Sequence, residues 1–230
     1  MIKNAEKKLI AGTDEAGRGC VVGPLVIAGI SIDAEKEHLL KKMGCKDSKL
    51  LSPNRREKLA TAIEKTAKDI IVLKIAPCKI DTYRKTGVNL NKLEAMKFAE
   101  AINYLEPQKA FVDCPDVNME RLKAFMAKMV GDGVELVVEH KADFNYPAVS
   151  AASIIAKVER DADIVELREK YGDFGSGYPS DPRTIQWLEN WLANNKKFPD
   201  CVRNTWDTAE VIKVNKEQSK LSKWIQKAVK

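Results

Sequence analysis

Leu9-Ile10-Ala11-Gly12-Thr13-Asp14-Glu15-Ala16-Gly17 is the stretch that decides how this chain folds. Its first five residues are apolar or small and predict a short buried strand, which ends at Asp14-Glu15 and the turn-forming Gly17. The apolar residues 25–32 follow closely enough to form an antiparallel partner strand. Two acidic residues at the end of a buried strand are therefore the feature from which a function can be sought.

Strands and helices alternate through the residues that follow. Ser52-Pro53 predicts the start of a helix, because serine caps helix N-termini and proline suits the first turn. Apolar residues on one side of segment 90–105 predict an amphipathic helix packed on a sheet. Pro147 opens a helix rich in small residues, whose backbone can approach a sheet closely. Further strands are expected at 70–75, 110–112 and 134–138.

The composition changes to Gly, Ser, Tyr and Pro over residues 172–181, which indicates a boundary. Helical patterns follow around residues 187–192 and from Val211 onward. Strands alternating with helices, then an all-helical end, predict an α/β fold with a helical C-terminal appendage. The predicted domains are an α/β domain over residues 1–175 and a helical domain over residues 176–230.

Bulk composition is typical of a globular protein that buries a core, with 44% hydrophobic and 31% charged residues in 230. The net charge of +6 suits a polyanionic partner, although solvated lysines give the same value. Five cysteines without a C-x-x-C pair argue against a zinc ribbon or a disulfide framework. The start of the chain has no apolar stretch of signal-peptide length, and no apolar run is long enough to span a bilayer, so we expect a cytoplasmic protein with no membrane partner. A monomer is also expected.

Acidic residues follow three of the predicted strands, as Asp14-Glu15, Asp113 and Asp143. Strand ends gather at one edge of a sheet, where clustered carboxylates would repel one another. Mg²⁺ or Mn²⁺ would remove that repulsion, because these hard ions prefer oxygen ligands. Sites that hold two such metal ions about 3.5–4 Å apart catalyse the cleavage of phosphodiesters. Adjacent strand residues point to opposite faces, so Asp14 and Glu15 can share a site only if the chain already turns at Glu15.

The plainer interpretation is that each acid is a solvated turn residue, and spacing alone does not decide between the two. His140 is an alternative nitrogen ligand, but one histidine without a cysteine partner does not suit zinc.

Four blocks of sequence stand in order along the chain: residues 13–24 (TDEAGRGCVVGP), 46–50 (KDSKL), 140–143 with 150–157 (HKAD, SAASIIAK) and 175–182 (GSGYPSDP). Together they resemble type 2 ribonuclease H, the ribonuclease HII family, and its archaeal members in particular. The resemblance implies a ribonuclease H-like mixed sheet flanked by helices. It also implies an endonuclease that hydrolyses the RNA strand of RNA/DNA hybrids and cuts 5′ of ribonucleotides in duplex DNA.

The family's catalytic residues correspond here to four carboxylates that would hold two Mg²⁺ or Mn²⁺ ions: Asp14, Glu15, Asp113 and Asp143. The implied products carry a 3′-hydroxyl and a 5′-phosphate, as ribonucleotide excision repair and DNA replication require. Asp113 is supported only by the Phe111-Val112 before it, and Asp116 is its rival. The roles of His140 and Lys157 stay open.

Substrate choice must depend on the ribose 2′-hydroxyl. The resemblance assigns this to the backbone of Gly17, Arg18 and Gly19 and to Tyr178, which would read the ribonucleotide–deoxyribonucleotide junction. Glycines let the main chain approach a sugar, although a strand-ending turn and a packed loop aromatic are the plainer interpretations. Cys20 stands where many members have proline, and is interpreted as a packing residue.

Lys46, Ser48 and Lys49 would contact DNA phosphates, which position a duplex without reading its sequence, or would belong to a solvated loop.

The C-terminal residues 218–225 resemble the Q-x-x-L-x-x-aromatic-aromatic peptide that docks on sliding clamps. The clamp contacts would be Gln218, Leu221, Trp224 and Ile225, with Ile225 in place of the second aromatic residue. A terminal helix packed on its own protein would show the same apolar stripe, and the lysines after position 211 would also suit nucleic acid.

Two other functions remain alternatives to the hybrid-cutting endonuclease. One is a two-metal nuclease of the same fold that acts on DNA. The other is a non-catalytic hybrid-binding or clamp adaptor, against which the four filled acidic positions argue.

Overall fold

The structure is a computed structural model that describes residues 8–45 and 51–228, with side chains up to residue 218. Lys46, Ser48 and Lys49 therefore lie outside the described residues, as do the side chains of Leu221, Trp224 and Ile225.

The described chain forms two compact units. The first unit takes in the chain up to Ala16 together with Val26–Lys74 and Asn89–Asp161. The second unit takes in Gly17–Leu25, Ile75–Val88 and the chain from Ala162. The proposed domain boundary between residues 175 and 176 stays a prediction.

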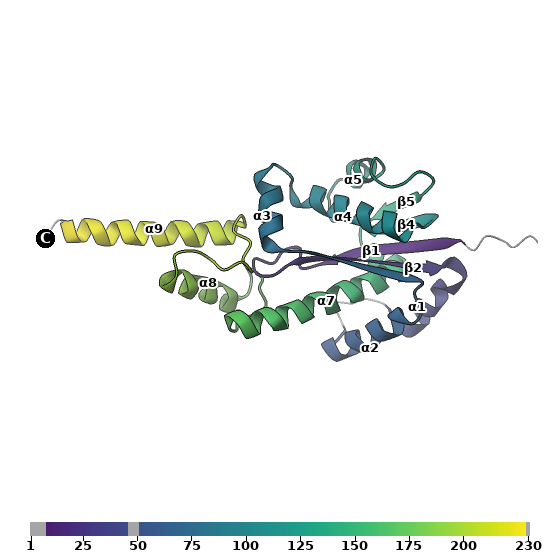
Figure 1. The fold of residues 1–230 in the computed structure, drawn as a ribbon, viewed down its shortest axis with the longest axis horizontal. Helices are drawn as coiled ribbons and strands as arrows, with labels where there is room; N and C mark the ends of the chain where they lie inside the picture. Colours follow the sequence, from purple (N-terminus) through teal and green to yellow (C-terminus); the bar gives the residue numbers. More distant parts are fainter. Residues whose placement is uncertain (1–7, 46–50, 229–230) are drawn as a thin grey trace, which may run out of the picture. The chain divides into compact units, whose positions relative to one another are not determined.

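A mixed five-stranded sheet runs through the first unit (Figure 1). Its strands are β1 (Leu9–Ala16), β2 (Leu25–Asp33), β3 (Asp69–Ile75), β4 (Lys109–Asp113) and β5 (Glu135–Glu139). Their order across the sheet is β3-β2-β1-β4-β5. β1 pairs antiparallel with β2 and parallel with β4, and β4 pairs parallel with β5. The antiparallel partner predicted for the first strand is thus confirmed.

Helices cover both faces of this sheet (Figure 1). One face carries α4 (Leu90–Leu105) and α5 (Met119–Met126), and the other carries α1 (Glu37–Met43), α2 (Pro53–Glu64) and the start of α7 (Pro147–Tyr171). A short 3-10 turn, η1 (Ala34–Lys36), precedes α1, and the short α6 (Ala142–Asn145) precedes α7. The predicted α/β class with a mixed sheet flanked by helices is confirmed.

The predicted start of α2 is confirmed by its cap. The Ser52 hydroxyl oxygen accepts a hydrogen bond from the Arg55 backbone N–H at 3.3 Å, and Pro53 occupies the first helical position. The amphipathic segment 90–105 also forms the expected helix, with Phe98, Ala101 and Ile102 fully buried. α1 and α5 span seven and eight residues and were not predicted, because two turns give too short an apolar pattern.

Helix α7 approaches the sheet as closely as its small residues suggested. A Cβ atom placed on Gly12 of β1 would lie 2.3 Å from the Ala148 carbonyl carbon and 2.3 Å from the Val149 backbone nitrogen. Ala148, Val149 and Ala152 are fully buried in this contact layer. Glycine at position 12 is therefore required by the helix packed on it.

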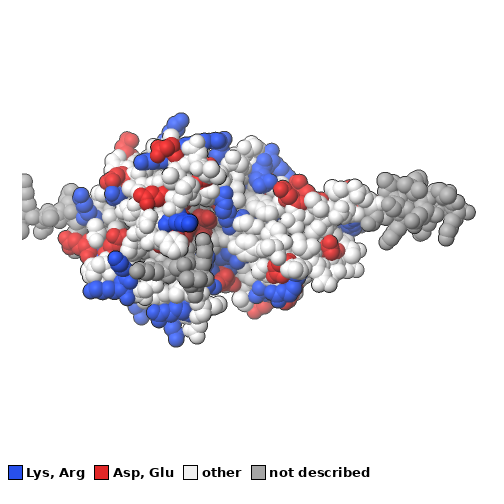
Figure 2. Space-filling model, turned by 180° about the vertical axis from the view of Figure 1, so that it is seen from behind, with Lys and Arg blue, Asp and Glu red and all other residues white. Residues whose placement is uncertain are grey.

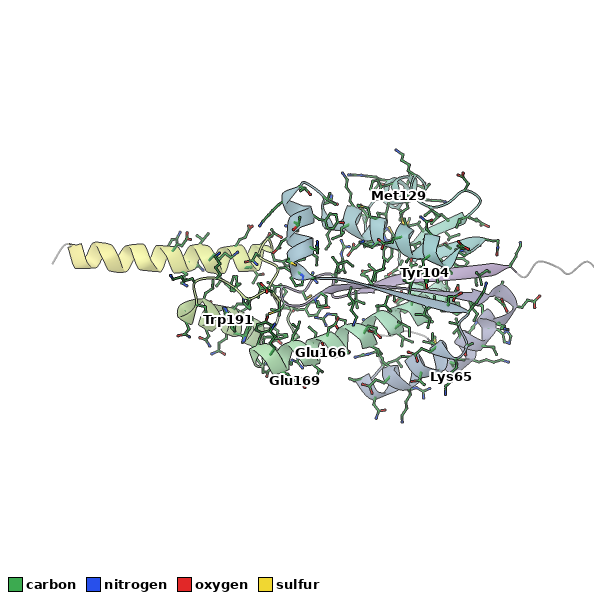
Figure 3. The ribbon with its side chains drawn as sticks, viewed as in Figure 1. Lys65, Tyr104, Met129, Glu166, Glu169 and Trp191 are labelled. Carbon is green, nitrogen blue, oxygen red and sulfur yellow. The ribbon has the colours of Figure 1, made fainter. Side chains whose placement is uncertain are left out.

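The second unit contains α3 (Pro77–Lys85), the end of α7, α8 (Pro182–Asn194) and α9 (Asp207–Ala228). Its core gathers Phe174, Leu188, Leu192 and Val202, and tryptophans pack beside them. Trp191 of α8, labelled in Figure 3, meets Tyr171 edge to face with ring centroids 5.8 Å apart. The predicted helical C-terminal region is present. Among residues 8–45 and 51–228, no helix is long and apolar enough to cross a membrane.

Candidate active site

The register of the sheet brings two of the predicted carboxylates to the same level. Thr13 of β1 pairs with Val112 of β4, and Val112 pairs with Val138 of β5. Asp14 and Asp113 each follow directly after this row. The pairing of β1 with β4 ends at Thr13, so Asp14 stands at the open end of that ladder beside Asp113.

Asp14 lies at the centre of the acidic group. Its side chain is 5% exposed, and its Oδ1 accepts a hydrogen bond from the Glu15 backbone N–H at 2.7 Å. Burial raises the pKa of Asp14 well above its usual value, and the negative charges of Glu15 and Asp113 raise it further. A hydrogen bond from Ser153 of α7 opposes this pKa shift. The charges of both Glu15 and Asp113 therefore act on the Asp14 carboxylate.

The turn expected at Glu15 was wrong. β1 continues through Ala16, and Glu15 still pairs with Ile27 of β2. The chain leaves the strand at Gly17, whose φ of 80° is in the left-handed region that favours glycine. The Asp14 carboxylate nevertheless accepts a hydrogen bond from the Glu15 backbone N–H, and the charge of Glu15 raises the pKa of Asp14.

Asp113 is joined to the segment that carries Asp143. Its Oδ1 accepts a hydrogen bond from the Ala142 backbone N–H at 2.8 Å, at the start of α6. Lys141, with a φ of 56°, turns the chain there so that this N–H faces β4. Asp143 follows in the first turn of α6 and is 6% exposed. Asp143 therefore directly follows Ala142, the residue whose backbone N–H donates a hydrogen bond to Asp113.

The four carboxylates offer only oxygen atoms, which suits a hard divalent ion. The repulsion that raises the pKa of Asp14 is also what a cation would relieve. In the described part of the chain, no group of three or more His, Cys, Asp and Glu side chains is placed so that it could already hold a metal ion. The residue types and their electrostatics fit the implied ions, which would have to draw the side chains together.

Asp116, the rival of Asp113, is turned to other partners. Its carboxylate accepts a hydrogen bond from the Asn118 backbone N–H at 3.1 Å. That bond and one from Asn91 lower the pKa of Asp116. His140 is exposed, and its Nδ1 lies 3.3 Å from the Cys114 carbonyl oxygen. Asp113 is among the charges that raise the pKa of Asp14, and neither Asp116 nor His140 is.

The predicted recognition residues belong to the second unit. Gly17, Arg18 and Gly19 form the turn that follows β1, and a Cβ on Gly19 would lie 3.9 Å from the ring of Tyr178. Tyr178 itself is half-buried. Cys20 is fully buried with its Sγ 3.0 Å from the Gly17 carbonyl oxygen, in agreement with a packing role.

Arg203 holds this turn and was not predicted. Its fully buried guanidinium donates hydrogen bonds to the carbonyl oxygens of Gly17 at 2.6 Å, Arg18 at 2.8 Å and Gly23 at 3.1 Å. The Trp206 ring lies 4.7 Å from it. One arginine among 39 basic residues has no distinguishing pattern in the sequence, so only the fold reveals it.

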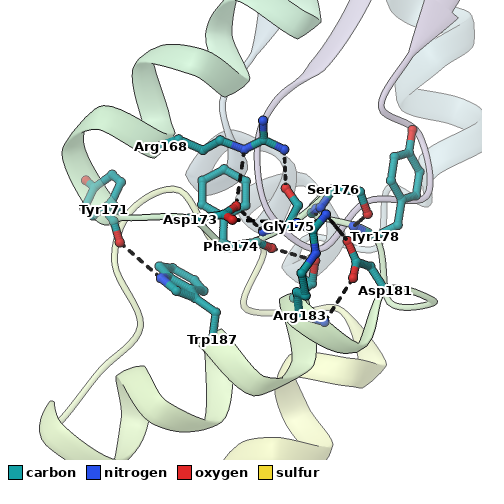
Figure 4. Close-up of polar contacts among 12 residues, drawn as sticks. Arg168, Tyr171, Asp173, Phe174, Gly175, Ser176, Tyr178, Asp181, Arg183 and Trp187 are labelled. Carbon is teal, nitrogen blue, oxygen red and sulfur yellow. Dashed lines mark hydrogen bonds and ion pairs between the residues drawn. The ribbon is translucent and has the colours of Figure 1, made fainter.

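The loop that carries Tyr178 is held from both sides. The Gly177 carbonyl oxygen accepts hydrogen bonds from the backbone N–H groups of Val21 at 2.8 Å and Val22 at 3.1 Å. Asp181 accepts one from the Ser176 backbone N–H at 2.7 Å, and this bond is the main reason why the pKa of Asp181 falls to about 2. Figure 4 shows Asp181 turned back on this loop, with the Tyr178 ring directed away from the network.

Known proteins are similar to this chain in both sequence and fold. A sequence model described as Ribonuclease HII matches residues 11–209 of this chain. Ribonuclease HII of Pyrococcus abyssi is 45% identical over 215 residues, which cover 93% of this chain and 95% of that relative.

Two solved structures resemble the chain. The crystal structure of ribonuclease H2 from Pyrococcus horikoshii OT3 matches with a TM-score of 0.85 and 46% identity, over 90% of this chain and 98% of that one. A chain of the PCNA:RNase HII complex from Archaeoglobus fulgidus matches with a TM-score of 0.81 and 48% identity, over 88% and 96%. The ribonuclease H-like fold implied by the sequence blocks is therefore confirmed. On these similarities in sequence and fold, the chain belongs to the ribonuclease HII family.

Proposed function

We propose that the chain hydrolyses the RNA strand of RNA/DNA hybrids and cuts 5′ of single ribonucleotides in duplex DNA, leaving 3′-hydroxyl and 5′-phosphate ends. As a member of its family it is a ribonuclease H, an endonuclease acting on phosphodiesters. The finer proposal rests on one observation: Asp14 is buried, and the charges of Glu15 and Asp113 act on it. Asp143 follows Ala142, whose backbone N–H donates a hydrogen bond to Asp113. A site of this kind suits the charge of a phosphodiester only when cations accompany it.

Asp14, Glu15, Asp113 and Asp143 would hold two Mg²⁺ or Mn²⁺ ions. When bound, such ions generate a water nucleophile and stabilise the leaving oxygen. The chain's own part is to position the ligands: the Glu15 and Ala142 N–H groups and Ser153 orient the carboxylates of Asp14 and Asp113. Asp113 is preferred to Asp116 because the latter is already held by Asn118 and Asn91.

Recognition of the 2′-hydroxyl would use the Gly17-Arg18-Gly19 turn and Tyr178. The carbonyl groups of Gly17 and Arg18 point to the buried Arg203 guanidinium. In a trans peptide the N–H points opposite to the C=O, so the Arg18 and Gly19 N–H groups face away from Arg203. Arg203 thereby orients two backbone donors outward, where a ribose hydroxyl could accept from them.

The metal requirement can be tested on an RNA/DNA hybrid. We expect the wild-type chain to cut the RNA strand with Mg²⁺ or Mn²⁺ and to stop when a chelator is added. Asp14→Asn removes one ligand charge and should lower kcat by at least about 100-fold, equal to about 2.7 kcal/mol. Asp116→Asn should retain the activity, because the Asp116 carboxylate accepts hydrogen bonds from Asn118 and Asn91. Equal losses in the two variants would contradict the assignment of Asp113 over Asp116.

A sliding clamp is the proposed protein partner. The Archaeoglobus fulgidus relative has been solved in a complex with PCNA. In this chain the clamp-type peptide, Gln218, Leu221, Trp224 and Ile225, falls within α9, and Gln218 is exposed. Apolar and aromatic anchors such as Leu221, Trp224 and Ile225 are the kind of side chain that dominates binding at protein–protein interfaces.

A further inference from the structure

A pocket of about 280 Å³ opens in the first unit between the start of α4 and the helix α5. Three of its lining residues are cationic: Lys92 from α4, and Arg121 and Lys128 from α5 and the turn after it. All three side chains are exposed, so their charges are accessible. None of the predicted metal ligands or recognition residues lines this pocket.

One acidic residue, Asp116, shares the pocket with these three cations. Its carboxylate is engaged by the Asn118 backbone N–H and by Asn91, so much of its charge is already balanced locally. Basic residues therefore exceed acidic ones in the pocket by three to one. Figure 2 shows Lys and Arg interspersed with Asp and Glu on one face of the molecule. Three cations around one pocket indicate an anion-binding site more specifically than the net charge of +6 does, because they concentrate the positive potential at one place.

The floor of the pocket is apolar. Leu122 is buried, Phe125 is half-buried, and Ala124 adds a small apolar surface beside them. A group that fits this pocket has an anionic part for the rim and an uncharged ring for the floor. A sugar phosphate of a nucleic-acid strand has both, and Arg and Lys are the residues that most often contact its phosphate oxygens.

The pocket is close to the candidate metal ligands along the chain. Asp116 is three residues beyond Asp113, so their Cα atoms are at most about 11 Å apart. The rise of 3.4 Å per step is measured along the helix axis, and successive phosphates of one strand are farther apart, about 6–7 Å, so this distance corresponds to about two nucleotides. A duplex whose scissile phosphate lies at the carboxylates thus has a phosphate within reach of the pocket.

We propose that the pocket formed by Lys92, Arg121 and Lys128 over Leu122 and Phe125 binds one sugar phosphate of the substrate, a few nucleotides from the bond that is cut. This inference rests on the proposed function and adds a contact separate from those predicted for Lys46, Ser48 and Lys49. Its role is positioning: it should affect how tightly the duplex is held and how it is aligned, and should leave the chemical step unchanged.

The first test is the salt dependence of binding to a hybrid duplex in the presence of a chelator, which prevents cleavage. The double variant Lys92→Gln/Arg121→Gln should reduce the slope of log Kd against log salt by about 0.9, the value for one phosphate contact. It should also raise KM with little change in kcat. The control is Lys123→Gln, which removes an exposed charge of α5 outside the pocket and should leave slope and KM unchanged. Thermal unfolding checks that the variants remain folded.

The second test locates the phosphate. In a set of duplexes, one phosphate at a time is replaced by an uncharged methylphosphonate. The wild type should lose affinity at one position about two nucleotides from the scissile bond, the span set by the Asp113–Asp116 separation. The double variant should be indifferent to that replacement while still responding at the other positions.

Identical profiles and slopes in the wild type and the double variant would overturn the proposal. They would indicate that the pocket serves another anion, such as an acidic peptide. Cleavage of the hybrid by the wild type would be unaffected by that result, so failure of this inference is distinguishable from failure of the proposed function.

Discussion

At the scale of single residues, the candidate metal site depends on a buried carboxylate, Asp14, whose charge is unfavourable where it lies. Asp14 is removed from water beside two other carboxylates, an arrangement that is unfavourable when all of them are ionised. An acidic residue near the end of the first strand could be predicted from the sequence, although β1 runs two residues past Asp14, to Ala16. The hydrogen bond from Ser153 could not, because residues 139 positions apart meet only in the fold.

The raised pKa of Asp14 gives a prediction on stability. The folded state binds this proton more tightly than the unfolded state, so in the absence of metal, stability falls as the pH rises from the usual aspartate range through the raised pKa. Asp14→Asn removes this repulsion and should raise the melting temperature of the metal-free chain at pH 7 by about 2–4 °C, the shift expected for 1 kcal/mol. Calorimetry with a chelator measures it.

The same variant should respond less to Mg²⁺, because metal stabilises only the state that binds it. Added Mg²⁺ should raise the melting temperature of the wild type and have a smaller effect on Asp14→Asn. If the Asp14→Asn variant melted below the wild type at pH 7 without metal, the carboxylates would not repel one another as inferred.

Arg203 gives a second prediction at this scale. Arg203→Met leaves the buried carbonyl groups of Gly17 and Gly23 and the partly buried one of Arg18 without this donor, and should cost about 2–4 kcal/mol in the free energy of unfolding. Arg203→Lys keeps the charge but not the three-way geometry, and should lower kcat/KM on a single-ribonucleotide duplex by about tenfold or more. The control is Arg84→Met, since Arg84 lies over the same Trp206 ring at 4.9 Å and is exposed. Equal effects at positions 84 and 203 would rule out a special role for Arg203.

At the scale of elements, local patterns predicted those helices and strands that are long enough to show a period. The Ser52 cap and the apolar face of α4 are signals within one segment, and both are confirmed. The end of β1 was misplaced because Asp14 and Glu15 look like strand-ending residues, whereas pairing with β2 carries the strand on to Ala16. Long-range pairing thus overrode local preference.

The contact between β1 and α7 makes a prediction for Gly12. Gly12→Ala would place a Cβ 2.3 Å from the α7 backbone, which cannot move aside as a side chain can. We expect destabilisation by about 3 kcal/mol or more, measured as a lower denaturant midpoint. Gly29→Ala on β2 is the matched control, because its nearest neighbour would be the flexible Leu105 side chain at 3.0 Å. If Gly12→Ala unfolded no more easily than Gly29→Ala, close packing of α7 on β1 would be disproved.

At the scale of the whole molecule, the sequence predicted the class of fold, and it named candidate site residues because the blocks that carry them are continuous. The candidate carboxylates come from β1, β4 and α6, and the contacts that join them, such as the hydrogen bond from Ala142 to Asp113, depend on the fold. The same holds for the Gly17-Arg18-Gly19 turn, to which Arg203 donates its hydrogen bonds. No period or motif encodes the three bonds of Arg203 or the basic pocket beside α5.

The proposed clamp partner is tested on the intact chain. Trp224→Ala should weaken binding to a sliding clamp by about tenfold or more, the usual effect of removing an aromatic anchor. Cleavage of a short duplex without the clamp should be unchanged. Lys227→Ala, in the same helix and outside the motif, is the control. Clamp affinity that is unaltered by Trp224→Ala would reject the motif.

The proposed reaction is tested most sharply by two DNA duplexes that differ only in one 2′-hydroxyl. With Mg²⁺, the wild-type chain should cut the ribonucleotide-containing duplex once, on the 5′ side of the ribonucleotide, and leave the all-DNA duplex intact. Sequencing-gel analysis should show a 3′-hydroxyl and a 5′-phosphate at the break. Equal cutting of both duplexes, or no cut at the ribonucleotide, would contradict the proposed reaction.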